Sequence, residues 1–173
     1  MRASLIVSSV LMWACLTSPV LAQSMEGLVG SWKLISASAT NAAGVVNNTP
    51  YGANVTGALI YTADGRVTAL LSYGDRKPLS GSDRLTAPVA ERADAYATFF
   101  AYSGRYSVTA DRVTHHVDIA SYPNWVNTDL IRTFVLEGNR LTLRTPPLSV
   151  GGTMTASDLI WEKMSPGMAV NKR

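Results

Sequence analysis

The chain has 173 residues, of which 47% are hydrophobic and 16% are charged, with 13 glycines, 8 prolines and 1 cysteine. This composition is typical of one compact globular domain and excludes a disordered or fibrous chain. The net charge of +3 comes without a basic run or stripe, so nucleic acid is a poor partner for this protein.

Residues 1–22 have the pattern of a cleaved secretory signal. A basic start is followed by an apolar stretch that reaches Cys15, and Ala22 supplies a small residue at the cleavage position. Polar residues and a proline interrupt the stretch, which excludes an integral membrane span. We expect residues 23–173 to form an exported domain, either periplasmic or secreted. Loss of Cys15 would leave that domain without disulfides, cysteine nucleophiles or thiolate metal sites.

From Gly30 onward, short β-rich runs alternate with turn dipeptides, which is the pattern of an all-β barrel or sandwich. We expect eight strands, over residues 31–37, 54–62, 66–73, 105–109, 112–121, 130–137, 140–145 and 155–163. Asp-Gly, Ala-Asp and Gly-Asn pairs between them favour tight turns, so consecutive strands should pair antiparallel as an up-and-down meander. Eight such strands can close into a barrel with room for one small ligand, and a two-sheet sandwich is the main alternative.

One helix is expected to interrupt the strands, over residues 88–102. Ala93, Tyr96, Ala97 and Phe100 follow the spacing of one helical face, and a Ser-Gly pair follows as a stop signal. We expect this helix to lie across the sheet or over one mouth of the barrel.

A set of short motifs stands in a distinctive order along the chain. Gly30-Ser31-Trp32 has the Gly-x-Trp pattern, and the later motifs lie at residues 57–65, 102–106, 114–117, 123–126, 140–147 and 159–162. In order and spacing these motifs resemble the lipocalin-like domain of bacterial and fungal proteins. The resemblance covers nearly all of residues 28–163. It implies a small closed or nearly closed barrel with a cavity, and it implies no particular reaction.

The resemblance also implies roles for individual residues. Trp32 corresponds to the ring that plugs the narrow end of a lipocalin. In that family the ring is often stacked under an arginine of a late strand, and Arg144 is the candidate for this stacking arginine. Asn127 stands where the Asn-Trp-Val-Gly turn of the family has glycine.

Residues 112–121 hold the strongest candidate for function. Strand alternation puts His115 on the apolar face together with Ile119. Beside a cavity, His115 would be a hydrogen-bonding or acid–base group for a ligand, and the alternative is a core histidine bonded to a neighbouring hydroxyl. His116 should face solvent, beside Asp118.

Arg132 alternates with the apolar residues of its strand and is therefore drawn toward the interior. A buried guanidinium needs an acidic ligand or an internal carboxylate, unless its head reaches water at the barrel mouth. Aromatic walls with a polar edge are expected from four further residues, each of which also fits a plain core role: Tyr61, Tyr102, Tyr106 and Trp125.

No motif identifies a cofactor or a reaction. The two histidines are adjacent and therefore point to opposite faces of a strand, and no third histidine is available, so we expect no metal site. The chain lacks a Gly-x-Ser-x-Gly elbow and any dinucleotide or phosphate loop, so we expect no cofactor and no hydrolase of that type.

The leading interpretation is an exported protein that binds a small hydrophobic or amphipathic molecule in the barrel cavity, through His115, Arg132 and the four aromatic residues named above. The alternative is a cavity enzyme of cyclase or isomerase type, acting on a small hydrophobic substrate that resembles a natural product. A third class is a structural barrel with a filled interior. An internal cavity of roughly 300 Å³ or more would favour the first two classes.

Overall fold

The structure is a computed structural model that describes residues 25–165. The expected signal at residues 1–22, with Cys15, lies outside the described residues. The expected start of the mature domain at Gln23 therefore stays a prediction.

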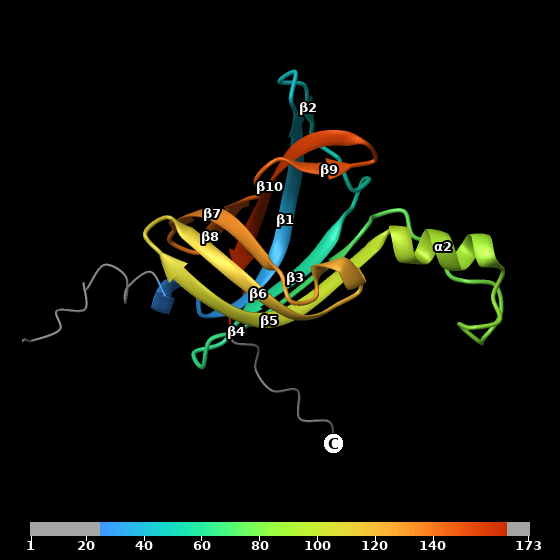
Figure 1. The fold of residues 1–173 in the computed structure, drawn as a ribbon, viewed down its shortest axis with the longest axis horizontal. Coiled ribbons are helices and arrows are strands. Elements are labelled where there is room, and N and C mark those ends of the chain that lie inside the picture. Colours follow the sequence, from blue (N-terminus) through green and yellow to red (C-terminus); the bar gives the residue numbers. More distant parts are fainter. Residues whose placement is uncertain (1–24, 166–173) are drawn as a thin grey trace, which may run out of the picture.

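Eight antiparallel strands close into a barrel (Figure 1). In chain order they are β1 (Gly30–Asn41), β3 (Thr56–Tyr61), β4 (Arg66–Ser72), β5 (Phe99–Thr109), β6 (Arg112–Ala120), β7 (Asp129–Glu137), β8 (Arg140–Arg144) and β10 (Thr153–Lys163). Each strand pairs with the next in this order, and β10 pairs back onto β1, which closes the sheet. The predicted up-and-down barrel is confirmed, and the sandwich alternative is wrong.

Two short strands extend the barrel at one end. β2 (Val46–Asn47) pairs with β1, and β9 (Leu148–Val150) pairs with β10. β1 has 12 residues and β10 has 11, so both strands run past the barrel wall and carry the two short strands beyond it, at the top of Figure 1.

The helix α2 (Val89–Ala97) is shorter than predicted and lies outside the barrel. Phe99 already pairs with Ser72 at the start of β5. Thr98 and the two phenylalanines after it are β-branched or aromatic, which favours pairing with β4 over another helical turn. No residue of this described helix is buried, and Figure 1 shows it projecting from the side of the barrel. The expected position across the sheet or over a mouth is therefore wrong.

One half of the barrel interior is packed around Trp32. The indole is 0% exposed, and its Nε1 donates a hydrogen bond to the Leu28 carbonyl at 2.8 Å. Three further side chains in this half are fully buried: Val67, Val113 and Leu141. Trp32 is therefore a core residue at the place where the resemblance implies a plug.

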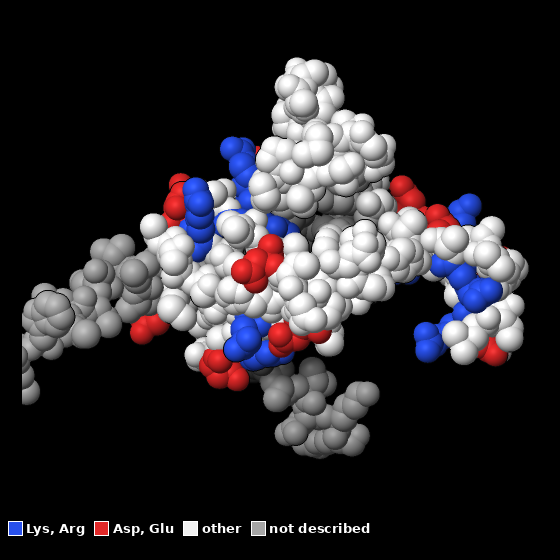
Figure 2. All heavy atoms as spheres, in the orientation of Figure 1, with Lys and Arg blue, Asp and Glu red and all other residues white. Residues whose placement is uncertain are grey.

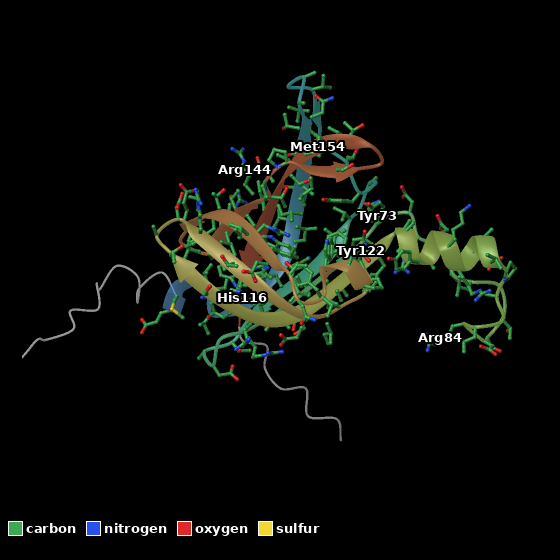
Figure 3. The ribbon with its side chains drawn as sticks, viewed as in Figure 1. Tyr73, Arg84, His116, Tyr122, Arg144 and Met154 are labelled. Carbon is green, nitrogen blue, oxygen red and sulfur yellow. The ribbon has the colours of Figure 1, made fainter. Side chains whose placement is uncertain are left out.

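The cation next to this plug is a lysine. The Lys163 ammonium lies 5.2 Å from the centroid of the Trp32 ring, within the usual range of a cation–π contact. Arg144 lies on the outer surface of β8 and forms hydrogen bonds of 2.6 Å with the Asp158 carboxylate (Figure 3). The expectation that Arg144 stacks on Trp32 is wrong, because Arg144 alternates with the buried leucines of its strand.

A β-bulge changes the direction of the side chains within β6. Opposite Ser103-Gly104 of β5, strand β6 contains one extra residue, Asp118. A Cβ atom at Gly104 would lie 1.9 Å from the His116 carbonyl oxygen, so the close approach of the two strands requires glycine. The extra residue turns Ile119 outward, where it is 66% exposed. The expected place of Ile119 on the inner face with His115 is therefore wrong.

Candidate functional site

The other half of the barrel interior holds a cavity of about 210 Å³. Aliphatic side chains from β3, β4, β8 and β10 form part of the wall. The aromatic part of the wall comes from Tyr51, Tyr73, Phe100, Tyr102, Trp125 and Trp161. The polar part comes from Arg132, Thr145, Thr155 and Ser157. An apolar wall with a few polar groups is the usual composition of a small-molecule site.

The size of this cavity limits what it can hold. Its volume of about 210 Å³ is below the roughly 300 Å³ at which sites for drug-sized ligands begin. It exceeds the roughly 150 Å³ of an engineered apolar cavity that binds benzene in another protein. The volume of roughly 300 Å³ that would favour the two ligand-binding classes is therefore not reached, although the interior is open rather than filled.

A row of contacting rings borders the open end of the cavity. Tyr51 contacts Tyr73 and Phe100 with ring centroids 5.2 Å and 6.2 Å apart, and Trp125 contacts Phe100 and Tyr122 at 5.8 Å and 5.6 Å. Figure 3 shows Tyr73 and Tyr122 at the same end of the barrel, and Tyr122 is 42% exposed. The row therefore reaches the surface and offers ring faces and edges to an aromatic ligand.

The surface around this end carries few charges. Figure 2 shows mostly uncharged residues over β2, β9 and the short 3₁₀ helix η1 (Pro123–Trp125), with acidic and basic residues at the edges of this area. A mostly uncharged surface at this end suits the approach of an apolar molecule.

A buried hydrogen-bond network lies between the cavity and the packed half. The Tyr61 hydroxyl is 2.7 Å from His115 Nε2, and the Tyr102 hydroxyl is 2.7 Å from His115 Nδ1. His115 is 0% exposed. Because both ring nitrogens are engaged, a neutral imidazole accepts from one tyrosine and donates to the other. Tyr102 is the member of this network that lines the cavity.

Burial keeps the network neutral. Desolvation is the main cause that lowers the pKa of His115 to about 3, and the positive charge of Arg132 adds to it. Desolvation also raises the pKa of both Tyr61 and Tyr102, against a smaller opposite effect of Arg132. At neutral pH all three side chains are uncharged, and none titrates near pH 7, where a general acid or base works best.

Arg132 is the charged side chain at the cavity. It lies on the inner face of β7 and is 7% exposed. Its Nη1 donates a hydrogen bond of 2.9 Å to the Ile131 carbonyl. None of the ion pairs found among residues 25–165 includes Arg132. Its charge therefore faces tyrosine hydroxyls and the cavity rather than a carboxylate.

The predicted site residues divide between the cavity and the layer beneath it. The structure places three of them in the cavity wall: Tyr102, Trp125 and Arg132. Tyr61 and His115 lie outside that wall and contact it through Tyr102. Tyr106 packs on Tyr61 with ring centroids 4.8 Å apart, and its hydroxyl donates to the Thr62 carbonyl at 3.1 Å.

Sequence reasoning missed several residues of the cavity wall. Tyr73 continues the alternation of β4, and Trp161 alternates with the buried Leu159 of β10, so a period-two signal exists for both. Phe100 is missed because the helix is expected to run through it. Tyr51 lies in the loop before β3, where no periodicity indicates the direction of a side chain.

A second histidine cluster lies on the outer surface of the barrel (Figure 3). His116 Nδ1 is 2.7 Å from the Asp129 carboxylate, and His116 Nε2 is 3.0 Å from the Ser107 hydroxyl. Asp118 pairs with Arg66 at 2.6 Å, so the expected neighbour of His116 was wrong. The connectivity is that of a Ser-His-Asp hydrolase, but such catalysis also needs preorganised donors in a site that excludes water. These exposed side chains lie away from the cavity, and we assign them a structural role.

In the part of the chain that the structure describes, no group of three or more His, Cys, Asp or Glu side chains is placed to hold a metal ion. No helix within residues 25–165 has the length and apolar character needed to span a bilayer.

Comparison with known proteins identifies the family. A model of the lipocalin-like domain matches residues 29–164, which is most of the chain. The chain belongs to the lipocalin-like domain family. This membership confirms the resemblance carried by the Gly-x-Trp strand and the later motifs. Within the left-handed turn after η1, the lipocalin-like chain has Asn127 at a φ of 61°, a conformation that glycine adopts readily and asparagine tolerates.

One curated relative of this lipocalin-like chain is a carrier protein. Over 93 residues the chain is 36% identical to the 4'-hydroxy-3'-methoxypropiophenone carrier protein ppsC of Aspergillus oryzae. The match covers 49% of this chain and 84% of the relative.

Solved structures show more distant likenesses. An uncharacterized protein from Bacteroides eggerthii is 15% identical, with a TM-score of 0.39 over 79% of this chain and 99% of its own. The fluorescent protein UnaG is 12% identical, with a TM-score of 0.37 over 81% and 99%. Rv2717c from M. tuberculosis is 13% identical, with a TM-score of 0.31 over 86% and 99%.

Proposed function

We propose that this lipocalin-like protein binds one small, largely apolar molecule in its barrel cavity and acts as its carrier. The observation that carries the proposal is the cavity of about 210 Å³, lined by six aromatic side chains and open at one end. The packed half around Trp32 closes the other end. The carrier name of the relative ppsC supports the same function.

The proposed cargo contains one aromatic ring with short substituents. A ring of this size fits the cavity volume, and Phe100 and Trp125 offer it edge and face contacts. The cargo named for ppsC is a single-ring ketone of the same size class. It is therefore the first probe to use.

Export is a separate part of the proposal. The basic start, the interrupted apolar stretch and the small residue Ala22 support removal of residues 1–22. The intact mass of the protein recovered from the culture medium or the periplasm tests this part. A chain that begins at Gln23 is expected, and a chain that retains the segment, or a lipid on Cys15, would contradict it.

A cavity enzyme of cyclase or isomerase type is the second candidate. Tyr102 favours it, because this hydroxyl lies at the cavity wall with His115 behind it. We prefer the carrier function because burial lowers the pKa of His115 and raises the pKa of Tyr102. Neither group therefore titrates near neutral pH, where a general acid or base works best. Mass spectrometry of a bound probe after prolonged incubation separates the two: a carrier returns it unchanged, and an enzyme converts it.

The binding site itself can be tested with a variant that fills the cavity. Ala69 lines the cavity and is 6% exposed, so Ala69→Leu should occupy the space of the ligand. Ala93→Leu is the matched control, because Ala93 lies on the exposed helix α2. Binding of 4'-hydroxy-3'-methoxypropiophenone can be followed by the fluorescence of Trp125 and Trp161, which line the cavity.

We expect the parent and Ala93→Leu to bind one probe per chain and Ala69→Leu to lose at least about tenfold in affinity. Equal affinity of all three proteins would contradict the cavity as the site. Absence of saturable binding to the parent, for this probe and its single-ring analogues, would contradict the carrier proposal itself.

A further inference from the structure

The chemical class of the ligand can be inferred from Arg132. Removing a guanidinium from water is costly, and folded proteins keep such a charge where an interaction offsets that cost. In most proteins a carboxylate that pairs with the arginine offsets this cost. None of the ion pairs among the described residues includes Arg132. The side chain is nevertheless 7% exposed and lies on the inner face of the barrel.

Arg132 has donors that face open space. A guanidinium carries five N–H donors, and one Arg132 nitrogen donates to the Ile131 carbonyl. Among residues 25–165, the buried side-chain nitrogen or oxygen that lacks a partner is Trp161 Nε1. The other Arg132 nitrogens are not in that unpartnered set, the guanidinium interacts with the Tyr102 hydroxyl, and the cavity is the space that both side chains line.

The other polar groups around Arg132 are neutral. Tyr61 on β3, Tyr102 on β5 and His115 on β6 feel its charge, and burial keeps each of them in the uncharged form. The remaining polar groups of the cavity wall carry no charge either: they are two threonines, a serine, the hydroxyls of Tyr51 and Tyr73, and the indole N–H of Trp161. The electrostatic potential in the cavity is therefore set by a single cation, and it favours a negative ligand group.

Tyr102 adds a second hydrogen-bonding atom next to this cation. Its hydroxyl lies 2.7 Å from His115 Nδ1. When Nδ1 carries the proton, it donates to the Tyr102 oxygen, and the Tyr102 hydroxyl hydrogen is free to donate into the cavity. Tyr61 then donates to Nε2, where it lies at 2.7 Å. His115 is thus a positioning residue that sets the donor direction of Tyr102 through its tautomer.

We propose that the ligand carries one acidic oxygen group, a carboxylate or an acidic phenol, and binds as an anion with this oxygen against Arg132 and Tyr102. The guanidinium fork matches such an oxygen group in geometry and charge. The ring of the ligand then lies along the aromatic wall toward the open end. This inference rests on the proposed carrier function and adds the chemical class of its cargo.

The test uses two pairs of probes with matched shapes. One pair is 4'-hydroxypropiophenone and its methyl ether 4'-methoxypropiophenone, and the other is 3-phenylpropanoate and 3-phenylpropanamide. In each pair the second molecule lacks the acidic group. We expect the parent to prefer the acidic member of at least one pair by about 10- to 100-fold, which is the usual strength of a hydrogen bond to a charged group. The pair that shows the preference distinguishes a phenol from a carboxylate.

Variants connect that preference to one side chain. Arg132→Gln should remove the preference for the acidic probe, and Arg132→Lys should keep part of it, because it retains the charge without the fork. Arg105→Gln removes the same charge from an exposed position on β5 and should keep the whole preference. An unchanged preference in Arg132→Gln would overturn the inference.

A spectroscopic signature on the parent makes the test independent of how the variants fold. A phenolate absorbs at longer wavelength than its phenol, so bound 4'-hydroxypropiophenone should show the phenolate band at a lower pH than the free molecule. Equal affinities within both pairs, with no such shift, would overturn the inference and leave the carrier function standing. No binding of any of the four probes would instead contradict the carrier function.

The role of His115 has its own readout. The chain contains two histidines, so ¹⁵N-histidine labelling gives two imidazole spin systems, and His116→Asn assigns them. In the complex with the acidic probe, we expect the His115 signals of the tautomer with the proton on Nδ1. The opposite tautomer in that complex would exclude donation from Tyr102 to the ligand.

Discussion

His115 shows how a single buried residue depends on three strands at once. Alternation within β6 indicates that its ring points inward, and the structure confirms this direction. Its partners come from β3 and β5, and their hydroxyls take both ring nitrogens. Contacts of this kind depend on the register between strands, which the alternation within one strand does not specify.

The pKa of His115 predicts a pH dependence of stability. The folded-state pKa is about 3, against 6.5 for an unperturbed histidine. Between these values the unfolded chain binds a proton that the folded chain does not, so the free energy of unfolding falls as the pH falls, by up to about 1.4 kcal/mol per pH unit. This contribution is complete above the pKa of the unfolded state and is lost toward pH 3.

Urea unfolding at about pH 7 and about pH 5 measures this effect. The parent and His116→Asn should lose stability over this interval, and His115→Gln should lose about 2 kcal/mol less. The same slope in His115→Gln and the parent would contradict the low pKa. If His115→Gln does not fold, the ¹⁵N chemical shifts of His115 in the parent protein measure its pKa directly. These shifts should remain those of a neutral ring down to about pH 4.

Trp32 and Trp125 provide a contrast between a core ring and a cavity ring. Trp32 is 0% exposed, and Trp32→Ala should lower the free energy of unfolding by about 3–5 kcal/mol. Trp125 is only partly buried and lines the cavity, so Trp125→Ala should cost less stability and weaken probe binding more. Thermal unfolding and probe titration measure the two effects. A Trp32→Ala variant that melts like the parent would exclude its role in closing the barrel.

At the scale of elements, turn dipeptides and strand alternation account for most of what could be predicted. The hairpin turns at residues 63–65, 110–111 and 138–139 connect strands where the sequence indicates them. The bulge in β6 could not be predicted, because it depends on the approach of Gly104 to the backbone of the neighbouring strand. The helix α2 ends earlier than its periodicity predicts, because pairing with β4 competes with helical periodicity there.

The bulge gives a prediction at this scale. In Gly104→Ala the new methyl group would meet the His116 carbonyl, so the two strands must separate, and we expect a loss of about 1–3 kcal/mol in the free energy of unfolding. Thr109→Ala, on the exposed face of the same strand, should stay within about 0.5 kcal/mol of the parent. Urea unfolding measures both variants. Parent-like stability of Gly104→Ala would contradict the close approach at this bulge.

The whole molecule is a barrel with two different halves. One half is packed around Trp32, and the other is open and lined by aromatic rings, with the network of Tyr61, His115 and Tyr102 between them. Strand alternation in the sequence predicts that the side chains of Arg132 and His115 point inward. It does not predict the boundary between the two halves, because that boundary depends on side chains from different strands meeting at one level of the barrel.

Together, the two proposals place a small molecule in the open half of the barrel, with its polar group against Arg132. The most direct measurement is a crystal structure of the complex with the tightest of the four single-ring probes. We expect density for one probe in the cavity, with its ring beside Phe100 and Trp125 and its oxygen within hydrogen-bond distance of the Arg132 guanidinium. An empty cavity with the probe bound on the outer surface would contradict this binding mode.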